Sequence, residues 1–167
     1  KLVNERVKSL QARFLADEST ARAELAQLRH AARQEPGTIP AVWELTSYPV
    51  SDWAPDEPTP EERAVHDAMC LYAIAQQSNS YEVHKTKLRT NRVGFGDAMR
   101  FLAWQDGQEE PRFRRRFDAA VTSDSYSELL THITALIRQI FHSKLAITMD
   151  FGSLAEELQT FQYPDGA

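Results

Sequence analysis

The sequence predicts an all-α protein, on three observations. Apolar residues recur at helical spacing through most of the 167 residues, and no segment alternates apolar and polar side chains convincingly as a half-buried strand does. Residues that commonly start helices stand in front of several of these periodic segments. We therefore expect compact helical packing, arranged as two small lobes on either side of residues 79–93.

Two helices are predicted at the start of the N-terminal lobe, which we place at residues 1–78. The first is indicated by apolar residues at helical spacing, Val7, Leu10 and Phe14. The second spans about residues 19–33 and carries Leu25 and Leu28. Asp17 or Ser19 is expected to cap it.

An acidic, proline-rich stretch follows these helices. Six of the eight prolines fall between Pro36 and Pro60, so residues 35–59 are expected to form a long ordered loop. Its large apolar side chains are expected to tuck against the helices: Trp43, Leu45 and Trp53. Thr59-Pro60-Glu61-Glu62 has the residues of a capping box and predicts a helix that runs to about Ser78.

The C-terminal lobe is expected over residues 94–167, after a basic and exposed connecting loop at 79–93. Gly94 and Gly96 precede a helix bearing Met99 and Leu102, and an arginine-rich helix follows at about 109–121. Ser123 or Asp124 is expected to cap the next helix, whose apolar stripe is the clearest in the chain: Leu129, Ile133, Leu136, Ile137, Ile140 and Phe141. Asp150 is expected to cap a last helix through Leu154, Leu158 and Phe161.

Charge is distributed unevenly along this chain, whose formal net charge is −5. Residues 84–116 hold nine basic and four acidic side chains, and residues 1–34 hold seven and four. Residues 35–67, in contrast, hold one basic and eight acidic side chains. Gathering like charge costs self-repulsion, so the basic segments indicate an anionic partner, most often a nucleic-acid backbone.

The arginine-rich helix, residues 112–117 reading Arg-Phe-Arg-Arg-Arg-Phe, carries the strongest part of this signal. At 100° per residue, one apolar face should dock it, formed by Phe113, Phe117, Ala120 and Val121. Arg115 then points away from that face, and guanidinium groups are suited to bidentate contacts with phosphate. The alternative to phosphate binding is that these arginines form a solvated charged face and pair with acidic neighbours such as Glu109 and Glu110.

The preceding loop gathers further basic side chains, which we expect to join the arginine helix in one groove: His84, Lys85, Lys87, Arg89 and Arg92. Tyr81 is the best candidate for an exposed aromatic, so tracking of the backbone is favoured over base stacking. The predicted contact set is Arg22, Arg29, Lys85, Lys87, Arg89, Arg92, Arg100, Arg112, Arg115 and Arg116. Arg33 shares the face of Arg22 and Arg29. The alternative is an architectural protein whose basic stripe docks on acidic protein surfaces.

Other classes of protein are disfavoured. No apolar run approaches the roughly 20 residues that span a bilayer, no signal-peptide pattern is seen, and the single Cys70 excludes an internal disulfide. A cytoplasmic protein without cofactors is expected. His66-Asp67, with further His and Asp residues elsewhere, raises the possibility of a helical metal phosphohydrolase. We interpret this pair as a helix surface and expect neither catalysis nor a metal, because no phosphate loop or nucleophile motif accompanies it.

Five segments, taken in order, resemble one known family. They are residues 21–32, Pro40-Ala41-Val42-Trp43, Leu71-Tyr72-Ala73, residues 94–103 and residues 115–124 ahead of the long apolar helix. Their order resembles that of the small subunit of the type I-E CRISPR surveillance complex Cascade, the CasB family. The resemblance spans nearly the whole chain, although each segment alone is a loose pattern.

The resemblance implies an all-helical, non-catalytic subunit, present in two copies, that contacts the backbone subunits, the large subunit and its own second copy. It implies a basic surface that helps hold the target and displaced DNA strands when guide RNA opens DNA into an R-loop. The matching basic positions are Arg22, Arg29, Arg100, Arg115 and Arg116, and the loop from Lys85 to Arg92 corresponds by position. No membrane partner is expected.

Overall fold

The computed structural model describes residues 1–49, 57–86, 93–105, 111–143 and 145–163. Within these ranges the chain forms α-helices and no strand, which confirms the all-α prediction. The helices are α1 (Leu2–Leu15), α2 (Ser19–Ala31), α3 (Trp43–Thr46), α4 (Pro60–Gln76), α5 (Phe95–Gln105), α6 (Pro111–Val121), α7 (Tyr126–His142) and α8 (Phe151–Phe161), with a 3-10 turn, η1 (Pro40–Val42), before α3.

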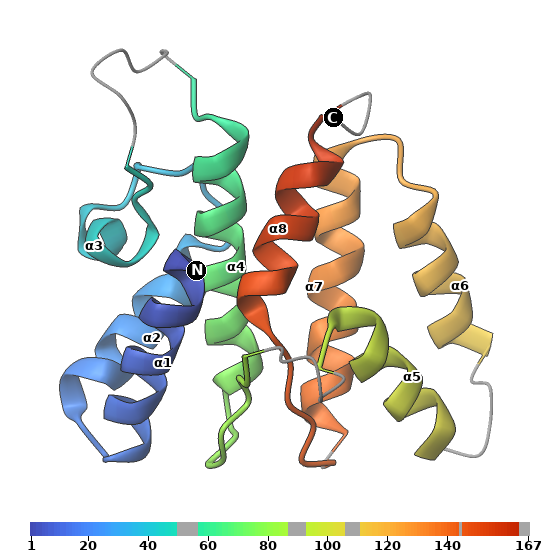
Figure 1. Cartoon of the computed structure of the whole chain (residues 1–167), viewed down its shortest axis with the longest axis horizontal. Helices are drawn as coiled ribbons and strands as arrows, with labels where there is room; N and C mark the ends of the chain where they lie inside the picture. The colour runs from blue at the N-terminus through green and yellow to red at the C-terminus, as the bar shows by residue number, and fades with distance from the viewer. Residues whose placement is uncertain (50–56, 87–92, 106–110, 144, 164–167) are drawn as a thin grey trace.

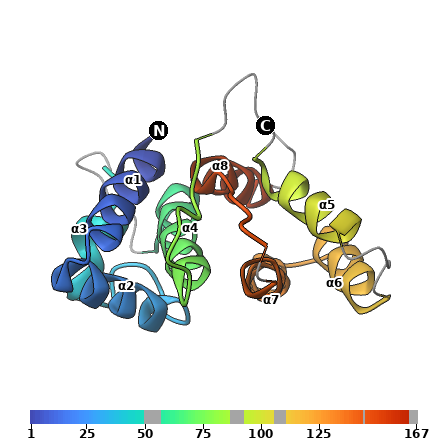
Figure 2. The same ribbon diagram turned by 90° about the horizontal axis from the view of Figure 1, so that it is seen from below.

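Helix α4 lies at the centre of the molecule. All its residues from Ala64 to Gln76 are buried, because α1, α2, α3, α7 and α8 all pack against it. Helices α1, α2 and α3 lie at one end of the long axis and α5 and α6 at the other (Figures 1 and 2). None of the described helices combines the length and apolar composition needed to cross a membrane.

Helix α8, the last in the chain, packs between the two ends. Its apolar stripe faces α4 and α1, and the backbone N–H of Gly152 donates to Asn4 Oδ1 of α1 at 3.0 Å. One buried cluster includes residues from both sides of the expected boundary, from Val3 to Leu158. The division of the chain at residues 79–93 stays a prediction.

The segment expected to be an exposed loop is partly buried. Val83, His84 and Val93 are buried, and the hydroxyl of Tyr81 donates to the carbonyl of Leu145 at 3.2 Å. His84 forms a parallel bridge with Met149, and the side chain of Gln11 makes hydrogen bonds to both its backbone N–H and its carbonyl. The prediction of exposure is therefore wrong for these residues, because the segment links α1 to the start of α8.

Local capping signals predicted two helix starts correctly. Thr59 and Glu62 form the expected capping box, with N···O distances of 2.8 and 3.2 Å. Asp150 caps α8 by accepting from Gly152 and Ser153. The predicted caps of the other two helices are wrong.

Those two helices begin differently for local reasons. Ser125 caps α7 by accepting from Glu128 N, whereas the hydroxyl of Ser123 donates back to Ala119 at the end of α6. Helix α2 begins after Glu18 without a side-chain cap, because Asp17 adopts a positive φ and pairs with Arg22.

The proline-rich stretch contains the short helix α3. Its Leu45 is partly buried against the core, as predicted. Trp43 is 55% exposed, so the prediction that it tucks inward is wrong; Val42 and Thr46 take the buried positions. The indole of Trp43 instead donates to the carbonyl of Gly37 at 2.9 Å. Trp53 lies outside the described residues.

Candidate nucleic-acid interface

Helix α6 presents arginines on the surface of the molecule. Arg114, Arg115 and Arg116 are exposed, and α6 packs on α7 through the buried Ala120. The predicted docking face is confirmed for Ala120 and wrong for Val121, which is 66% exposed at the end of the helix. Phe117 is 37% exposed. The side chains of Arg112 and Phe113 lie outside the described residues.

Helix α5 lies beside α6 in both views and adds one predicted residue, Arg100 (Figures 1 and 2). Its buried stripe contains Phe95, Met99 and Leu102, which leaves Arg100 exposed. Trp104, four residues on and about 40° away around the helix, shares this surface and is 77% exposed.

Trp104 was not predicted from the sequence, in which Tyr81 was the best candidate for an exposed aromatic. Its exposure could have been predicted from the sequence, because the helical period that buries Met99 and Leu102 places Trp104 on the opposite face of the helix. An exposed indole offers a flat surface on which any base can stack, and a neighbouring guanidinium can bind the adjacent phosphate. We define the basic face as Arg100 and Trp104 of α5 with Arg115 and Arg116 of α6.

The other predicted loop residues are only partly described. Lys85 is exposed, and its backbone N–H donates to the carbonyl of Met149 at 3.2 Å. Lys87, Arg89 and Arg92 lie outside the described residues. His84 does not belong to a basic surface, because it is buried and burial lowers the pKa of its imidazole.

The predicted arginines of α2 do not join the basic face. Arg22 forms an ion pair with Asp17, and α2 lies at the opposite end of the long axis from α6 (Figure 1). Arg29 is half-buried in a separate cleft between α2, α4 and α7, and burial lowers the pKa of its guanidinium. The predicted residues therefore lie in at least two places.

That cleft has a volume of about 760 Å³ and is lined by four arginines. Arg29 and Arg33 come from α2 and the segment just after it, Arg63 from α4 and Arg138 from α7. We call it the arginine cleft. Arg63 and Arg138 were not in the predicted set, since each is an isolated arginine in the sequence and only tertiary packing brings them to one site.

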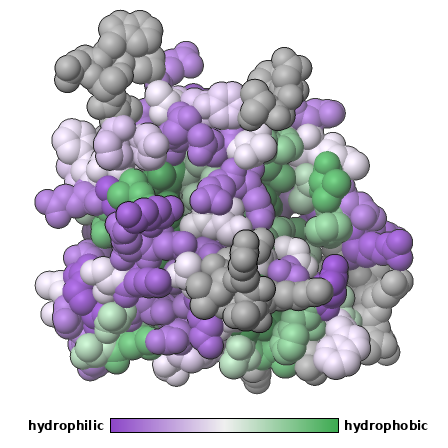
Figure 3. Space-filling model, viewed as in Figure 1, coloured by the Kyte–Doolittle hydropathy of each residue, from purple (hydrophilic) through white to green (hydrophobic). Residues whose placement is uncertain are grey.

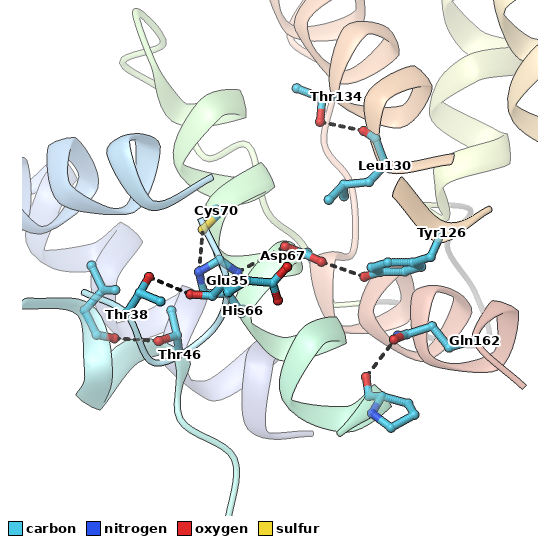
Figure 4. A network of polar contacts seen from close by, with 12 residues as sticks. Glu35, Thr38, Thr46, His66, Asp67, Cys70, Tyr126, Leu130, Thr134 and Gln162 are labelled. Atoms are coloured by element: carbon cyan, nitrogen blue, oxygen red, sulfur yellow. Dashed lines mark hydrogen bonds and ion pairs between the residues drawn. The ribbon is translucent and has the colours of Figure 1, made fainter. Parts of the chain in front are cut away.

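A buried polar network lies at the inner wall of the cleft. His66 Nδ1 is 3.0 Å from Asp67 Oδ1, and the hydroxyl of Tyr126 donates to Asp67 Oδ2 at 2.7 Å (Figure 4). His66 and Asp67 are 2% and 8% exposed, so their interpretation as a helix surface is wrong. Burial, followed by the charge of Asp67, raises the pKa of Tyr126.

This network has the contacts of a structural element. Asp67 has a partner on each carboxylate oxygen and joins α4 to α7. Burial raises the pKa of the Cys70 thiol nearby, which keeps it protonated at neutral pH. Among the described residues, no group of three or more His, Cys, Asp or Glu side chains is arranged to hold a metal ion.

The fold and surface define an all-helical protein with two separate basic sites, the basic face of α5 and α6 and the arginine cleft between α2, α4 and α7. The model of the family described as CRISPR-associated protein Cse2 matches residues 24–167, so the chain belongs to this family. The crystal structure of CasB from Thermobifida fusca is similar, with 28% sequence identity, a TM-score of 0.74, and coverage of 98% of this chain and 88% of that one. No curated protein matches the sequence.

Membership confirms the family resemblance drawn from the five segments. It also makes the chain a subunit of a CRISPR Cascade complex, in which it assembles with other subunits.

Proposed function

We propose that this chain is a non-catalytic subunit that binds nucleic-acid backbone without sequence preference and stabilises the R-loop of a type I-E CRISPR complex. Its ligands are the guide RNA–target DNA heteroduplex and the displaced single strand. It is present in two copies next to the backbone and large subunits, in the cytoplasm. Family membership supports the complex, and the basic face supports the ligand.

The observation that carries the proposal is the basic face of α5 and α6. Arg115 and Arg116 are exposed on α6, and Arg100 and Trp104 are exposed on the neighbouring helix α5 (Figures 1 and 2), so phosphate-binding groups accompany a stacking surface. R-loop formation exchanges a DNA duplex for a heteroduplex of similar stability, so modest contacts with the backbone can shift the equilibrium. Such contacts should be indifferent to sequence, because guanidinium groups on phosphate read no base edges.

Binding of mixed-sequence oligonucleotides, followed by fluorescence anisotropy across salt concentrations, tests this proposal. Arg115→Gln with Arg116→Gln should weaken binding and reduce the slope of log K against log salt by roughly 1.5, since each phosphate contact contributes about 0.7–0.9. Lys1→Gln with Lys8→Gln removes the same charge from α1 and the residue before it, and should leave the slope nearly unchanged. Equal effects of the two double variants would contradict the assignment of the basic face.

Trp104 allows a separate test of the single-strand contact. Trp104→Ala should weaken binding of single-stranded DNA, because stacking on an aromatic contributes about 1–3 kcal/mol per base, and should change duplex binding little. Trp43→Ala removes another exposed tryptophan, at the far end of the molecule, and is the matched control. A loss common to both variants would argue against stacking on α5.

The assembled complex then tests the R-loop itself. Charge reversal by Arg115→Glu with Arg116→Glu should lower the yield of R-loops on a matched target while the variant still assembles. Normal R-loop yield from that complex would favour the alternative, in which the basic face docks on acidic protein partners. Metal-dependent phosphodiester turnover that is lost in His66→Ala would contradict the non-catalytic assignment.

A further inference from the structure

The arginine cleft places cations where the described part of the chain gives them no carboxylate partner. No ion pair or hydrogen bond connects Arg29, Arg33, Arg63 or Arg138 to an acidic side chain among the described residues. Two acidic residues line the same cleft, Asp67 and Glu35. The oxygens of Asp67 are held by His66 and Tyr126, and the exposed Glu35 makes no ion pair with these arginines among the described contacts. Half-burying Arg29 costs solvation of its charge, and a bound anionic group would offset that cost.

Apolar side chains form part of the cleft lining. Ala32, just after α2, Ile74 of α4, and Leu130 and Ala135 of α7 line the cleft together with the arginines and with the polar side chains of α7. Ile74 is 5% exposed, and Leu130 packs against the core, so this surface is fixed by the fold. Figure 4 shows Leu130 and Thr134 on successive turns of α7. The hydroxyl of Thr134 donates to the carbonyl of Leu130 at 2.7 Å.

A nucleic-acid strand would be a poor ligand for a cleft that combines arginines with apolar side chains. A phosphodiester backbone brings no apolar group to the interior, and bases bind single-strand sites by stacking on exposed aromatic rings. The one aromatic residue that lines the described cleft is Tyr126, and its hydroxyl is held by Asp67. The basic face differs, because its arginines accompany an exposed indole.

An amphipathic helix with an acidic border would match both the arginines and the apolar side chains of the cleft. Helices α2 and α7 lie on either side of α4 (Figure 2), and residues of all three line the cleft, so an added helix would contact three helices at once. Its apolar stripe would cover Ala32, Ile74 and Ala135. Carboxylates flanking the stripe would reach Arg29 and Arg33 on one wall and Arg138 on the other.

We propose that the arginine cleft is a docking site for an acidic amphipathic helix of a partner protein. The site lies between α2, α4 and α7 and shares no residue with the basic face of α5 and α6. The proposal therefore stands independently of nucleic-acid binding by that face. It assigns protein assembly to the arginine cleft and the nucleic-acid backbone to the basic face.

The test uses a labelled peptide of about 16 residues with leucines on one helical face and glutamates beside them. A scrambled peptide of the same composition, without a continuous leucine face, is the first control, and a 16-nucleotide oligo-dT is the second. Arg33→Gln with Arg138→Gln removes one exposed charge from each wall without changing the buried core. Arg115→Gln with Arg116→Gln removes the same charge from the basic face.

The cleft variant should weaken binding of the amphipathic peptide about tenfold, and the α6 variant should leave it nearly unchanged. The scrambled peptide should bind the parent protein at least tenfold more weakly than the amphipathic one. Equal binding of the two peptides would overturn the proposal. A larger loss of oligo-dT binding than of peptide binding in the cleft variant would overturn it too, since the cleft would then be a nucleic-acid site.

Ala135→Phe provides a test without a change in charge. Ala135 is half-buried in the cleft, and a phenyl ring there would occupy the space meant for the apolar face of the peptide. Peptide affinity should fall about tenfold while oligo-dT affinity is retained. Unaltered peptide binding in this variant, with unchanged helicity by circular dichroism, would mean that the peptide does not enter the cleft.

Discussion

Asp67 shows how one buried carboxylate connects two helices. Tyr126 of α7 donates to one of its oxygens and the neighbouring His66 lies against the other, so both oxygens are satisfied away from solvent. Tyr126 also lines the arginine cleft, where Arg63 is close enough to offset part of the effect of Asp67 on its pKa. The network therefore fixes the spacing between α4 and α7, on which the shape of the cleft depends.

Removing the tyrosine hydroxyl should destabilise the fold. Tyr126→Phe leaves a buried carboxylate oxygen without its donor, which should cost about 1–3 kcal/mol of unfolding free energy in urea denaturation. Tyr163→Phe is the matched control, because that hydroxyl also donates to a carboxylate, Glu61, at 2.7 Å but on the surface. We expect a clearly smaller loss there, and similar losses in both variants would argue against a structural role for burial of Asp67.

His84 should make stability depend on pH. Burial lowers the pKa of its imidazole below the ordinary value of 6.5, so the unfolded chain binds a proton that the folded chain does not. Stability is then fully present above pH 6.5 and falls as the pH drops below it, by up to about 1.4 kcal/mol per pH unit. Thermal unfolding between pH 5 and pH 7.5 measures this slope.

His84→Asn should reduce that slope, because an amide does not titrate and its oxygen can accept from Phe151 N as Nδ1 does at 3.3 Å. His142→Asn changes an exposed histidine on α7 and serves as control. If both variants keep the parental slope, other groups cause the acid sensitivity.

At the scale of single elements, the features predicted correctly are helix caps and apolar stripes, which depend on residues close together in the sequence. The capping box at Thr59 and the cap at Asp150 need contacts within three residues, and both are confirmed. The stripe from Leu129 to Phe141 is buried as its period predicts. These features are visible in the sequence because the interacting residues are close along the chain.

The wrong and missing predictions depend on packing between distant elements. Trp43 is exposed because the orientation of α3 on α4 buries Thr46 instead. His84 is buried because Gln11 and Met149, far away in sequence, hold its backbone. The arginine cleft collects Arg29, Arg63 and Arg138 from three helices, and no local pattern connects them.

The contact of α1 with α8 depends on one glycine. A Cβ at position 152 would collide with the side chain of Asn4, which accepts from Gly152 N at 3.0 Å. Gly152→Ala should therefore displace Asn4 and cost about 1 kcal/mol of unfolding free energy. Asn4→Ala removes the same hydrogen bond, so the double variant should cost about as much as either single change. Additive losses would indicate that the two residues do not interact.

Several acidic side chains gather away from the arginines of the basic face. The acidic side chains Glu44, Glu57, Glu61 and Glu62 lie on α3 and around the start of α4, whereas Arg115 and Arg116 lie on α6 at the other end (Figure 1). The face seen in Figure 3 mixes hydrophilic side chains with smaller apolar patches. Such an arrangement helps to orient the chain on an anionic ligand, since these carboxylates are repelled while the basic face is attracted.

One continuous core should make the two expected lobes unfold together. Helix α8 follows the connecting segment in sequence but packs on α4 and α1, so neither half can bury its apolar side chains alone. Calorimetry should show a single transition whose calorimetric and van't Hoff enthalpies agree. Leu154→Ala, at a position 1% exposed on α8, should lower this one transition, with a loss of about 2–5 kcal/mol. Two transitions, of which Leu154→Ala shifts only the one belonging to residues 94–167, would instead mean that the lobes fold independently.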